Sequence, residues 1–88
     1  MNPRDREYRN RIEIIRDILV VLSGDDKWAS KTDIVYDARI NFGRLDTYLT
    51  PLIENNLVVE SGGESNSYSI TKRGRSLLSK IEEVICLI

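Results

Sequence analysis

Two short helical patterns in this chain are followed directly by a β-hairpin pattern, and this order constrains the fold more than any other feature. The first pattern, SKTDIVYDA, predicts a helix over residues 30–38, with Ser30 as its N-cap and Asp33 completing a capping-box-like arrangement. After a connection over residues 39–42, the apolar spacing predicts a second helix over residues 43–55. Two short helices joined in this way form a helix-turn-helix unit.

The hairpin pattern covers residues 57–70, where apolar LVV and alternating SYSI flank a turn-rich tip at residues 61–66. Because an isolated two-stranded hairpin is barely stable, we expect it to pack against the helices. Apolar residues spaced three and four apart predict longer helices over residues 5–23 and 72–88. The predicted fold class is therefore mainly α with a small β-hairpin, a winged helix-turn-helix in a single domain over residues 1–88.

Pro51 lies inside the helix predicted over residues 43–55. A proline in a regular helix interior costs about 3 kcal/mol. Two interpretations follow: the helix continues with a kink, or Thr50 caps a restart that has Pro51 at its first position. The apolar spacing passes through Pro51 without a phase break, which favours the continuous helix. In both cases residues 43–49 form an intact segment, and the early turns of the second helix are the part that meets base edges in helix-turn-helix docking.

Composition narrows the possible functions. The chain has 13 basic and 14 acidic residues, a net charge of −1, whereas general polyanion binders are normally basic. It has no histidine and one cysteine, Cys86, so the usual proton shuttle, most zinc-ligand patterns and an internal disulfide are missing. We expect no catalytic residues, no cofactor and no metal site. No apolar run approaches the roughly 20 residues of a membrane span, so we expect a cytoplasmic, nucleoid-associated protein.

The outward face of the helix predicted over residues 43–55 is small and mostly neutral. We expect Asn41, Arg44 and Thr47 to contact base edges, because Asn bonds adenine, Arg bonds guanine, and Thr contacts the thymine methyl group or phosphate. Tyr48 is expected either to buttress this helix or to contact phosphate. The alternative is that this face is an ordinary solvated helix surface.

Polar and basic residues also open two of the predicted helices. The expected phosphate contacts are Ser30, Lys31, Thr32, Lys72 and Arg73. Each cation at a helix N-terminus interacts unfavourably with the helix dipole, by about 0.3–1 kcal/mol. Phosphates bound nearby would offset this cost. Exposed charge that keeps the protein soluble explains these residues equally well. In the wing tip, Ser65 and Asn66 are candidates for hydrogen bonds to the DNA backbone or to a minor-groove edge. The negative charge of Glu64, in contrast, disfavours electrostatic attraction between the wing and phosphate.

The C-terminal sequence IEEVICLI is strongly apolar. Complete burial of each such side chain stabilises a fold by about 1.5–3 kcal/mol. Packing on the first helix of the same chain is one interpretation, and a dimer interface is the favoured one. The residues expected at this interface are Leu78, Ile81, Val84, Ile85 and Ile88. Cys86 is expected to be a small buried hydrophobe.

The chain resembles the small archaeal winged-helix DNA-binding proteins, the ten-kilodalton chromatin-protein class and related transcriptional regulators. The shared pattern covers nearly the whole chain and includes Lys31-Thr32, Tyr48-Leu49, Leu52, Leu57 and the passage Tyr68, Ile70-Thr71, Gly74. This resemblance implies DNA binding by the third helix and the wing, and homodimerisation through the last helix as an antiparallel coiled coil. Because this chain is less basic than the chromatin-type members and its last helix is shorter, a site-specific regulator is favoured over genome coating.

The sequence therefore predicts a dimeric winged-helix transcriptional regulator that binds double-stranded DNA in a sequence-dependent manner. The alternative is a winged-helix module that binds protein and not DNA. The near-neutral net charge of −1 and the acidic residue in the wing tip favour that alternative.

Overall fold

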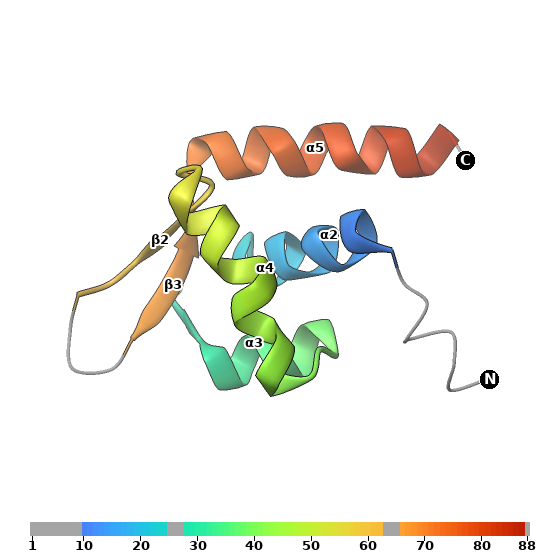
Figure 1. The fold of residues 1–88 in the computed structure, drawn as a ribbon. Coiled ribbons are helices and arrows are strands. Elements are labelled where there is room, and N and C mark those ends of the chain that lie inside the picture. The colour runs from blue at the N-terminus through green and yellow to red at the C-terminus, as the bar shows by residue number, and fades with distance from the viewer. Residues whose placement is uncertain (1–9, 25–27, 63–65, 88) are drawn as a thin grey trace.

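The computed structural model describes residues 10–24, 28–62 and 66–87. These residues form four helices and three short strands (Figure 1). The helices are α2 (Arg11–Leu22), α3 (Lys31–Ala38), α4 (Phe42–Glu54) and α5 (Lys72–Leu87), and the strands are β1 (Ala29–Ser30), β2 (Val58–Glu60) and β3 (Ser67–Ile70). Together they make a winged helix-turn-helix, so the predicted fold class is confirmed, except that a single chain does not test dimerisation through the last helix.

Helix α2 begins at Arg11, and not at residue 5 as predicted. Asn10 has extended backbone angles, and its Oδ1 accepts a hydrogen bond of 2.8 Å from the backbone N–H of Glu13. The Glu13 carboxylate accepts one of 3.4 Å from the backbone N–H of Asn10 in return. A residue in this capping box stands outside the helix, which excludes a continuous helix over residues 5–23. Residues 5–9 lie outside the described residues.

Helices α3 and α4 form the helix-turn-helix unit. Ser30 caps α3 as predicted: its Oγ accepts a hydrogen bond of 3.1 Å from the backbone N–H of Asp33, and the Asp33 carboxylate accepts one of 3.2 Å from Ser30. Arg39 ends α3 in the left-handed conformation, with φ of 57°. The buried Ile40 then anchors the connection to the core before α4 begins.

The sheet has three strands, whereas the sequence predicted two. Central β3 pairs antiparallel with β2, placing Val58 opposite Ile70, and also with β1, placing Ala29 opposite Tyr68. A two-residue strand cannot show an alternating pattern, which is why β1 was missed. Its pairing ties the beginning of α3 to the first half of β3, next to the tip of the hairpin, and this hairpin is the wing.

The core lies around α2, which contacts α3, α5 and β3. Ile18, Leu19, Ile34 and Leu45 have no exposed surface. Full burial of such side chains is worth up to about 1.5–3 kcal/mol each. Helix α5 lies along α2, at the opposite side of the molecule from α3 (Figure 1). Within the described residues, no helix has the length and apolar content to span a membrane.

Helix α4 runs through Pro51 without interruption, as the apolar spacing favoured. Leu49 and Leu52 are buried while Pro51 is exposed, so the proline ring lies on the outer side. At the end of the helix, Nδ2 of Asn55 donates a hydrogen bond of 2.8 Å to the carbonyl oxygen of Pro51. The same carbonyl oxygen also accepts a hydrogen bond of 3.0 Å from the backbone N–H of Asn55, so Asn55 closes the end of the helix with both its backbone and its side chain.

Gly74 allows α5 to lie close against the segment that follows α4. A Cβ atom at Gly74 would collide with the carbonyl oxygen of Leu57 and would lie 2.7 Å from Cγ1 of Ile70. Thr71 caps α5, because its Oγ1 accepts a hydrogen bond of 2.9 Å from the backbone N–H of Gly74 and donates one of 2.7 Å to the carbonyl oxygen of Asn56.

Candidate nucleic-acid interface

The first two turns of α4 present an exposed surface beside the α3–α4 connection. Phe42, Gly43, Arg44 and Thr47 are exposed, and we call them the α4 surface. Leu45, in contrast, is fully buried, so the helix turns one side to the core and the other outward. Neither the described part of the wing nor α5 covers the α4 surface (Figure 1).

Asn41, which was predicted to read a base, is the N-cap of α4. Its Oδ1 accepts a hydrogen bond of 2.8 Å from the backbone N–H of Gly43. A bidentate contact with adenine needs both the side-chain oxygen and the amide nitrogen. One lone pair of this oxygen therefore holds the start of α4, while its second lone pair and the amide nitrogen remain for DNA, so the base contact of Asn41 stays a prediction.

Lys31, a predicted phosphate contact, forms an ion pair with Asp46. Its Nζ lies 3.0 Å from Oδ1 of Asp46 on α4. The hydrogen bond to Asp46 is the largest reason why the pKa of Lys31 is raised. The pair connects α3 with α4, and any phosphate that approaches Lys31 must compete with this carboxylate.

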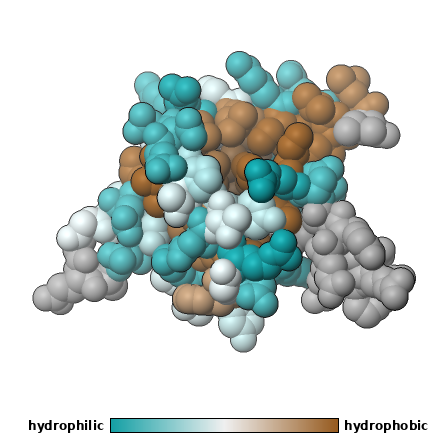
Figure 2. Space-filling model, in the orientation of Figure 1, coloured by the Kyte–Doolittle hydropathy of each residue, from teal (hydrophilic) through white to brown (hydrophobic). Residues whose placement is uncertain are grey.

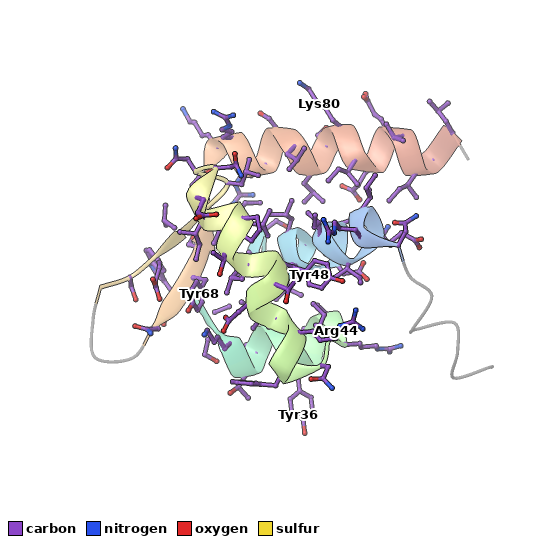
Figure 3. The ribbon with its side chains drawn as sticks, in the orientation of Figure 1. Tyr36, Arg44, Tyr48, Tyr68 and Lys80 are labelled. Atoms are coloured by element: carbon purple, nitrogen blue, oxygen red, sulfur yellow. The ribbon has the colours of Figure 1, made fainter. Side chains whose placement is uncertain are left out.

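Two exposed aromatic side chains lie at the helix-turn-helix, and the sequence analysis missed both. Tyr36 on α3 is 79% exposed and Phe42 at the start of α4 is 59% exposed. Tyr36 points away from the fold (Figure 3). Phe42 precedes the buried Leu45 by three residues, so its spacing resembles that of a core position. A phenylalanine exposed at the first turn of such a helix can pack on a thymine methyl group.

Comparison with protein families agrees with this geometry. A family model of winged helix-turn-helix proteins matches residues 8–88. The chain belongs to the winged helix-turn-helix family. Because the match covers nearly the whole chain, all of the elements described above fall within the family's domain.

Three similar proteins illustrate the range of similarity. An uncharacterized protein of Methanocaldococcus jannaschii is 35% identical over 80 residues, which make up 91% of this chain and 36% of that protein, so this chain spans about a third of its relative. The structure of Sso10a-2, a DNA-binding protein from Sulfolobus solfataricus, has a TM-score of 0.79 at 29% identity, covering 90% of this chain and 81% of that one. The transcriptional repressor CouR, bound to a 23-mer DNA duplex, has a TM-score of 0.69 at 19% identity, covering 81% and 52%, and shares the fold. The predicted resemblance to small winged-helix DNA-binding proteins is confirmed.

The winged-helix fold separates the predicted phosphate contacts into two groups. Ser30, Lys31 and Thr32 lie at the start of α3, near the first turns of α4 (Figure 1). Lys72 and Arg73 begin α5, which lies beside the C-terminal end of α4. A helix of the length of α4 spans about 20 Å. The structure therefore brings the first group, and not the second, to the α4 surface.

Tyr48 and the wing carry the remaining predicted contacts. The Tyr48 side chain is buried, which favours its role as a buttress of α4 over a contact with phosphate.

Ser65 lies outside the described residues, and Asn66 is exposed beside the wing tip. Next to the wing tip, where Tyr68 and Glu60 are paired across the hairpin, the Tyr68 hydroxyl donates a hydrogen bond of 3.1 Å to the Glu60 carboxylate. Burial, followed by this hydrogen bond, raises the pKa of Tyr68.

The predicted dimer residues of α5 divide between core and surface. Leu78 is 7% exposed and belongs to the core of its own chain, so its assignment to a dimer interface is corrected. Ile81 and Ile85 are half-buried, whereas Val84 is 52% and Leu87 is 87% exposed. Ile88 lies outside the described residues.

Cys86, predicted to be buried, is exposed in this chain. The reason is that the last turns of α5 extend past the first turn of α2, which leaves them with few neighbours in the same chain (Figure 1). In the described ranges, no three His, Cys, Asp or Glu side chains are grouped so that they could hold a metal ion.

Proposed function

We propose that this winged-helix protein binds double-stranded DNA in a sequence-dependent manner through the α4 surface and acts as a transcriptional regulator. The observation that supports this proposal is the exposed first two turns of α4, with Arg44, Thr47 and Phe42 free of α5 and of the described part of the wing. In helix-turn-helix docking these turns enter the major groove. The similarity to Sso10a-2, a DNA-binding protein, and to CouR, solved on a DNA duplex, points the same way.

The side chains of the α4 surface match the edges that the major groove displays. The Arg44 guanidinium can donate two hydrogen bonds to O6 and N7 of guanine, and Thr47 can contact a thymine methyl group or a phosphate. Gly43 has no side chain and allows close approach. At the start of α3, the hydroxyls of Ser30 and of the exposed Thr32 can donate hydrogen bonds to phosphate oxygens. Asn66 in the wing can form a hydrogen bond in a neighbouring groove of the same duplex.

The charge of the protein favours specific binding over coating. Its net charge is −1, and Asp46 adds an acidic group to the helix that carries Arg44. Sequence-independent affinity comes almost entirely from neutralised phosphates. We therefore infer that non-specific binding is weak and that affinity depends on base contacts made by the α4 surface.

A dimer through α5 is part of the same proposal. Val84 and Leu87 expose large apolar side chains on this helix, and the half-buried Ile85 lies between them. A second copy of α5 would cover them. Two copies of the α4 surface related by a two-fold axis would then read a site with matching symmetry.

Binding of a protein partner is the second candidate function. The near-neutral net charge and the exposed Tyr36 and Phe42 favour it, because aromatic side chains are enriched at protein interfaces. The two functions differ in their dependence on salt. Only a DNA complex loses affinity steeply as salt rises, with a slope set by the number of neutralised phosphates.

The deciding experiment selects duplexes from a random pool with the full chain and then measures their dissociation constants at several salt concentrations. We expect an enriched sequence, tight binding at low salt and a steep linear loss of affinity as salt rises. Arg44→Ala should weaken binding to that duplex by about 1–3 kcal/mol and relax the preference at one base pair. Ser79→Ala, at an exposed position on α5, is the matched control and should change nothing. Failure to retain any duplex even at low salt would refute DNA binding.

A further inference from the structure

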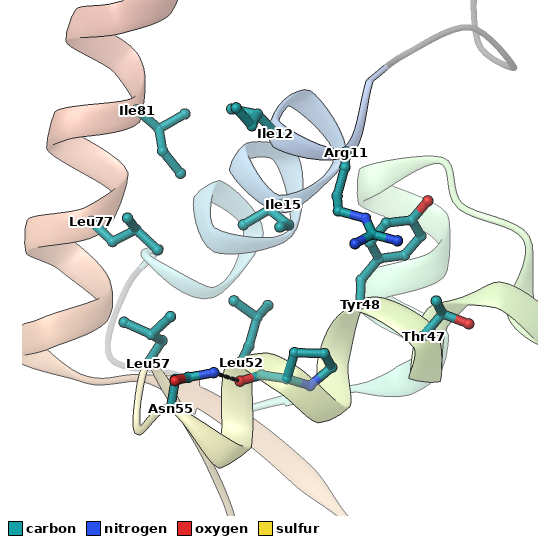
Figure 4. A pocket seen from close by; sticks show the side chains of 11 residues that line it. Arg11, Ile12, Ile15, Thr47, Tyr48, Leu52, Asn55, Leu57, Leu77 and Ile81 are labelled. Atoms are coloured by element: carbon teal, nitrogen blue, oxygen red, sulfur yellow. Dashed lines mark hydrogen bonds between the residues drawn. The ribbon is translucent and has the colours of Figure 1, made fainter.

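A hollow of about 420 Å³ lies between α2, α4 and α5. Six apolar side chains form most of its wall and point into it (Figure 4): Ile12, Ile15, Leu52, Leu57, Leu77 and Ile81. In the space-filling view, hydrophobic side chains gather at this level of the molecule, below α5, whereas the region of α3 is mostly hydrophilic (Figure 2). The volume falls within the range of about 300–1,000 Å³ that is typical of small-molecule sites.

One edge of the hollow is polar and cationic. Arg11 extends from the first turn of α2 toward Tyr48, and Thr47 stands beside them on α4 (Figure 4). Within residues 10–24, 28–62 and 66–87, no acidic side chain pairs with Arg11. The hollow therefore combines an apolar interior with a guanidinium at its edge that pairs with no acidic side chain in the described part of the chain.

More positive charge lies at the side of the larger hollow that is opposite Arg11. A smaller hollow of about 280 Å³ shares Asn55, Leu57 and Leu77 with the first and adds Arg73 and Lys80 to its wall. Among the described residues, no acidic side chain lines either hollow. Cations on both sides of an apolar cavity favour an anionic ligand over a neutral or cationic one.

We propose that the larger hollow binds a small organic acid with a compact apolar body of one or two rings. The body would occupy the space between Leu52, Leu77 and Ile15, and the carboxylate would accept hydrogen bonds from the Arg11 guanidinium, which pairs with carboxylates in a bidentate manner. A second copy of the chain is a less suitable occupant, because the most exposed apolar residues of α5, Val84 and Leu87, do not line the hollow.

The position of the hollow connects this ligand to DNA, a step that rests on the function proposed above. Thr47 belongs both to the α4 surface and to the wall of the hollow, and Pro51 lines the wall one turn later. A bound carboxylate would place negative charge beside the helix that approaches the polyanionic duplex. The acid is therefore an effector that lowers DNA affinity, and by linkage DNA lowers the affinity for the acid by the same factor.

The ligand site can be tested without DNA. The probe is anilinonaphthalene sulfonate, an apolar anion whose fluorescence rises in an apolar site, titrated into the full chain. Naphthoate and its neutral counterpart naphthalenemethanol serve as competitors. We expect one saturable site, and displacement by naphthoate at a concentration about tenfold lower than by the alcohol, because only the acid gains charged hydrogen bonds from Arg11.

Three variants, each checked for folding by thermal melting, locate the site. Arg11→Gln should weaken naphthoate about tenfold and leave the alcohol unchanged. Leu77→Trp fills the hollow and should abolish binding of both competitors. Val20→Trp, at an exposed position of α2 outside the hollow, is the matched control and should leave both unchanged. Multiple weak probe sites, equal affinity for acid and alcohol, or unchanged binding to Leu77→Trp would overturn the proposal.

Sedimentation with and without naphthoate tests the competing occupant. A dimer that excludes the probe and dissociates in the Leu77→Trp variant would assign the hollow to a second copy and overturn the ligand site. A mass that does not change with naphthoate, together with one saturable site, supports the ligand.

The effector role is tested with the selected duplex. Saturating naphthoate should lower DNA affinity about fivefold or more in the unmodified chain and should have no effect on Leu77→Trp. Naphthoate binding with unchanged DNA affinity would refute the coupling between ligand and DNA and would still support the ligand site. Naphthoate binding by a chain that retains no duplex would refute the proposed DNA function and still support the site.

Discussion

Lys31 on α3 and Asp46 on α4 form an ion pair across the helix-turn-helix, with Nζ 3.0 Å from Oδ1. Both side chains are partly exposed, 33% and 67%, so the pair contributes little to stability, about 0–1 kcal/mol. Its importance for the proposed function is greater. The Asp46 carboxylate lies on the helix proposed to enter the groove, and it engages a cation that would otherwise be free to meet a phosphate.

Asp46→Asn is therefore expected to tighten duplex binding. Removing the carboxylate releases Lys31 for one more phosphate contact, so the slope of log affinity against log salt should become steeper by about 0.9. Fluorescence anisotropy with the selected duplex at several salt concentrations measures both quantities. Glu83→Gln removes a negative charge at an exposed position of α5 and serves as the control for net charge. Equal gains from both substitutions would mean that the ion pair itself has no role.

Phe42→Ala is expected to remove recognition of a thymine methyl group. The unmodified protein should bind the selected duplex about fourfold more tightly than the same duplex with uracil in place of thymine, because one buried methyl-sized group is worth about 0.8 kcal/mol. The variant should bind both duplexes equally. Trp28→Ala, which removes another exposed aromatic side chain located outside α4, should preserve the discrimination. If Phe42→Ala discriminates as strongly as the unmodified protein, Phe42 does not read this methyl group.

Val84→Lys together with Leu87→Lys should convert a dimer to a monomer. Both side chains are exposed in the single chain, so these changes leave its core intact while placing charge in an apolar interface. Sedimentation equilibrium measures the mass, and thermal melting verifies the fold. Ser79→Lys adds charge to an exposed position of the same helix and should leave the mass unchanged. A monomeric unmodified chain, or a double variant of unchanged mass, would disprove this interface.

Gly74→Ala should destabilise the fold by about 1–3 kcal/mol, because its Cβ has no room against the carbonyl oxygen of Leu57. In an open helix the same change normally stabilises by about 1 kcal/mol, so the sign of the effect is diagnostic. Gly43→Ala is the matched control, because its Cβ would meet only the Asn41 side chain at 3.3 Å, and it should remain within about 1 kcal/mol of the unmodified chain. Urea unfolding measures both. Stabilisation by Gly74→Ala would show that α5 can move away from Leu57.

Alkaline pH should destabilise the fold through Tyr68 and Lys31. Burial raises the pKa of Tyr68 above 10.0, and the hydrogen bond to Asp46 raises the pKa of Lys31 above 10.5. The folded chain therefore holds both protons more tightly than the unfolded chain, so this stability is complete below the unfolded values and is lost as pH rises through the folded ones.

The melting temperature measured from about pH 8 to about pH 11 tests this sign. Tyr68→Phe cannot ionise and should show a smaller alkaline loss, whereas Tyr36→Phe, at an exposed position, should behave like the unmodified chain. An alkaline loss of the same size in Tyr68→Phe would exclude Tyr68 as its source.

Local patterns accounted for much of the fold. The spacing of Leu45, Leu49 and Leu52 predicted one continuous helix through Pro51, and the Ser30–Asp33 pair predicted the start of α3, because both signals act within a few residues along the chain. The winged-helix order followed from these elements and from the hairpin pattern.

Contacts between distant segments were not accessible in the same way. The pairing of Ala29 with Tyr68 and the ion pair of Lys31 with Asp46 each join segments that no local pattern relates. Leu78 and Ile85 share one apolar stripe of α5, and only the position of α2 beneath that stripe decides that the first is buried and the second half-buried. The hollow beside Arg11 likewise needs three helices in place before it exists.

The short strand β1 has a mechanical consequence. Ser30 ends β1 opposite Ser67 and at the same time caps α3, so the wing and the helix-turn-helix are joined through one residue. The two parts cannot hinge independently, and their mutual angle is set before any duplex arrives. Little conformational freedom would then be lost on docking. The DNA would have to bend to fit the protein, which makes the flexibility of its base steps a second source of selectivity.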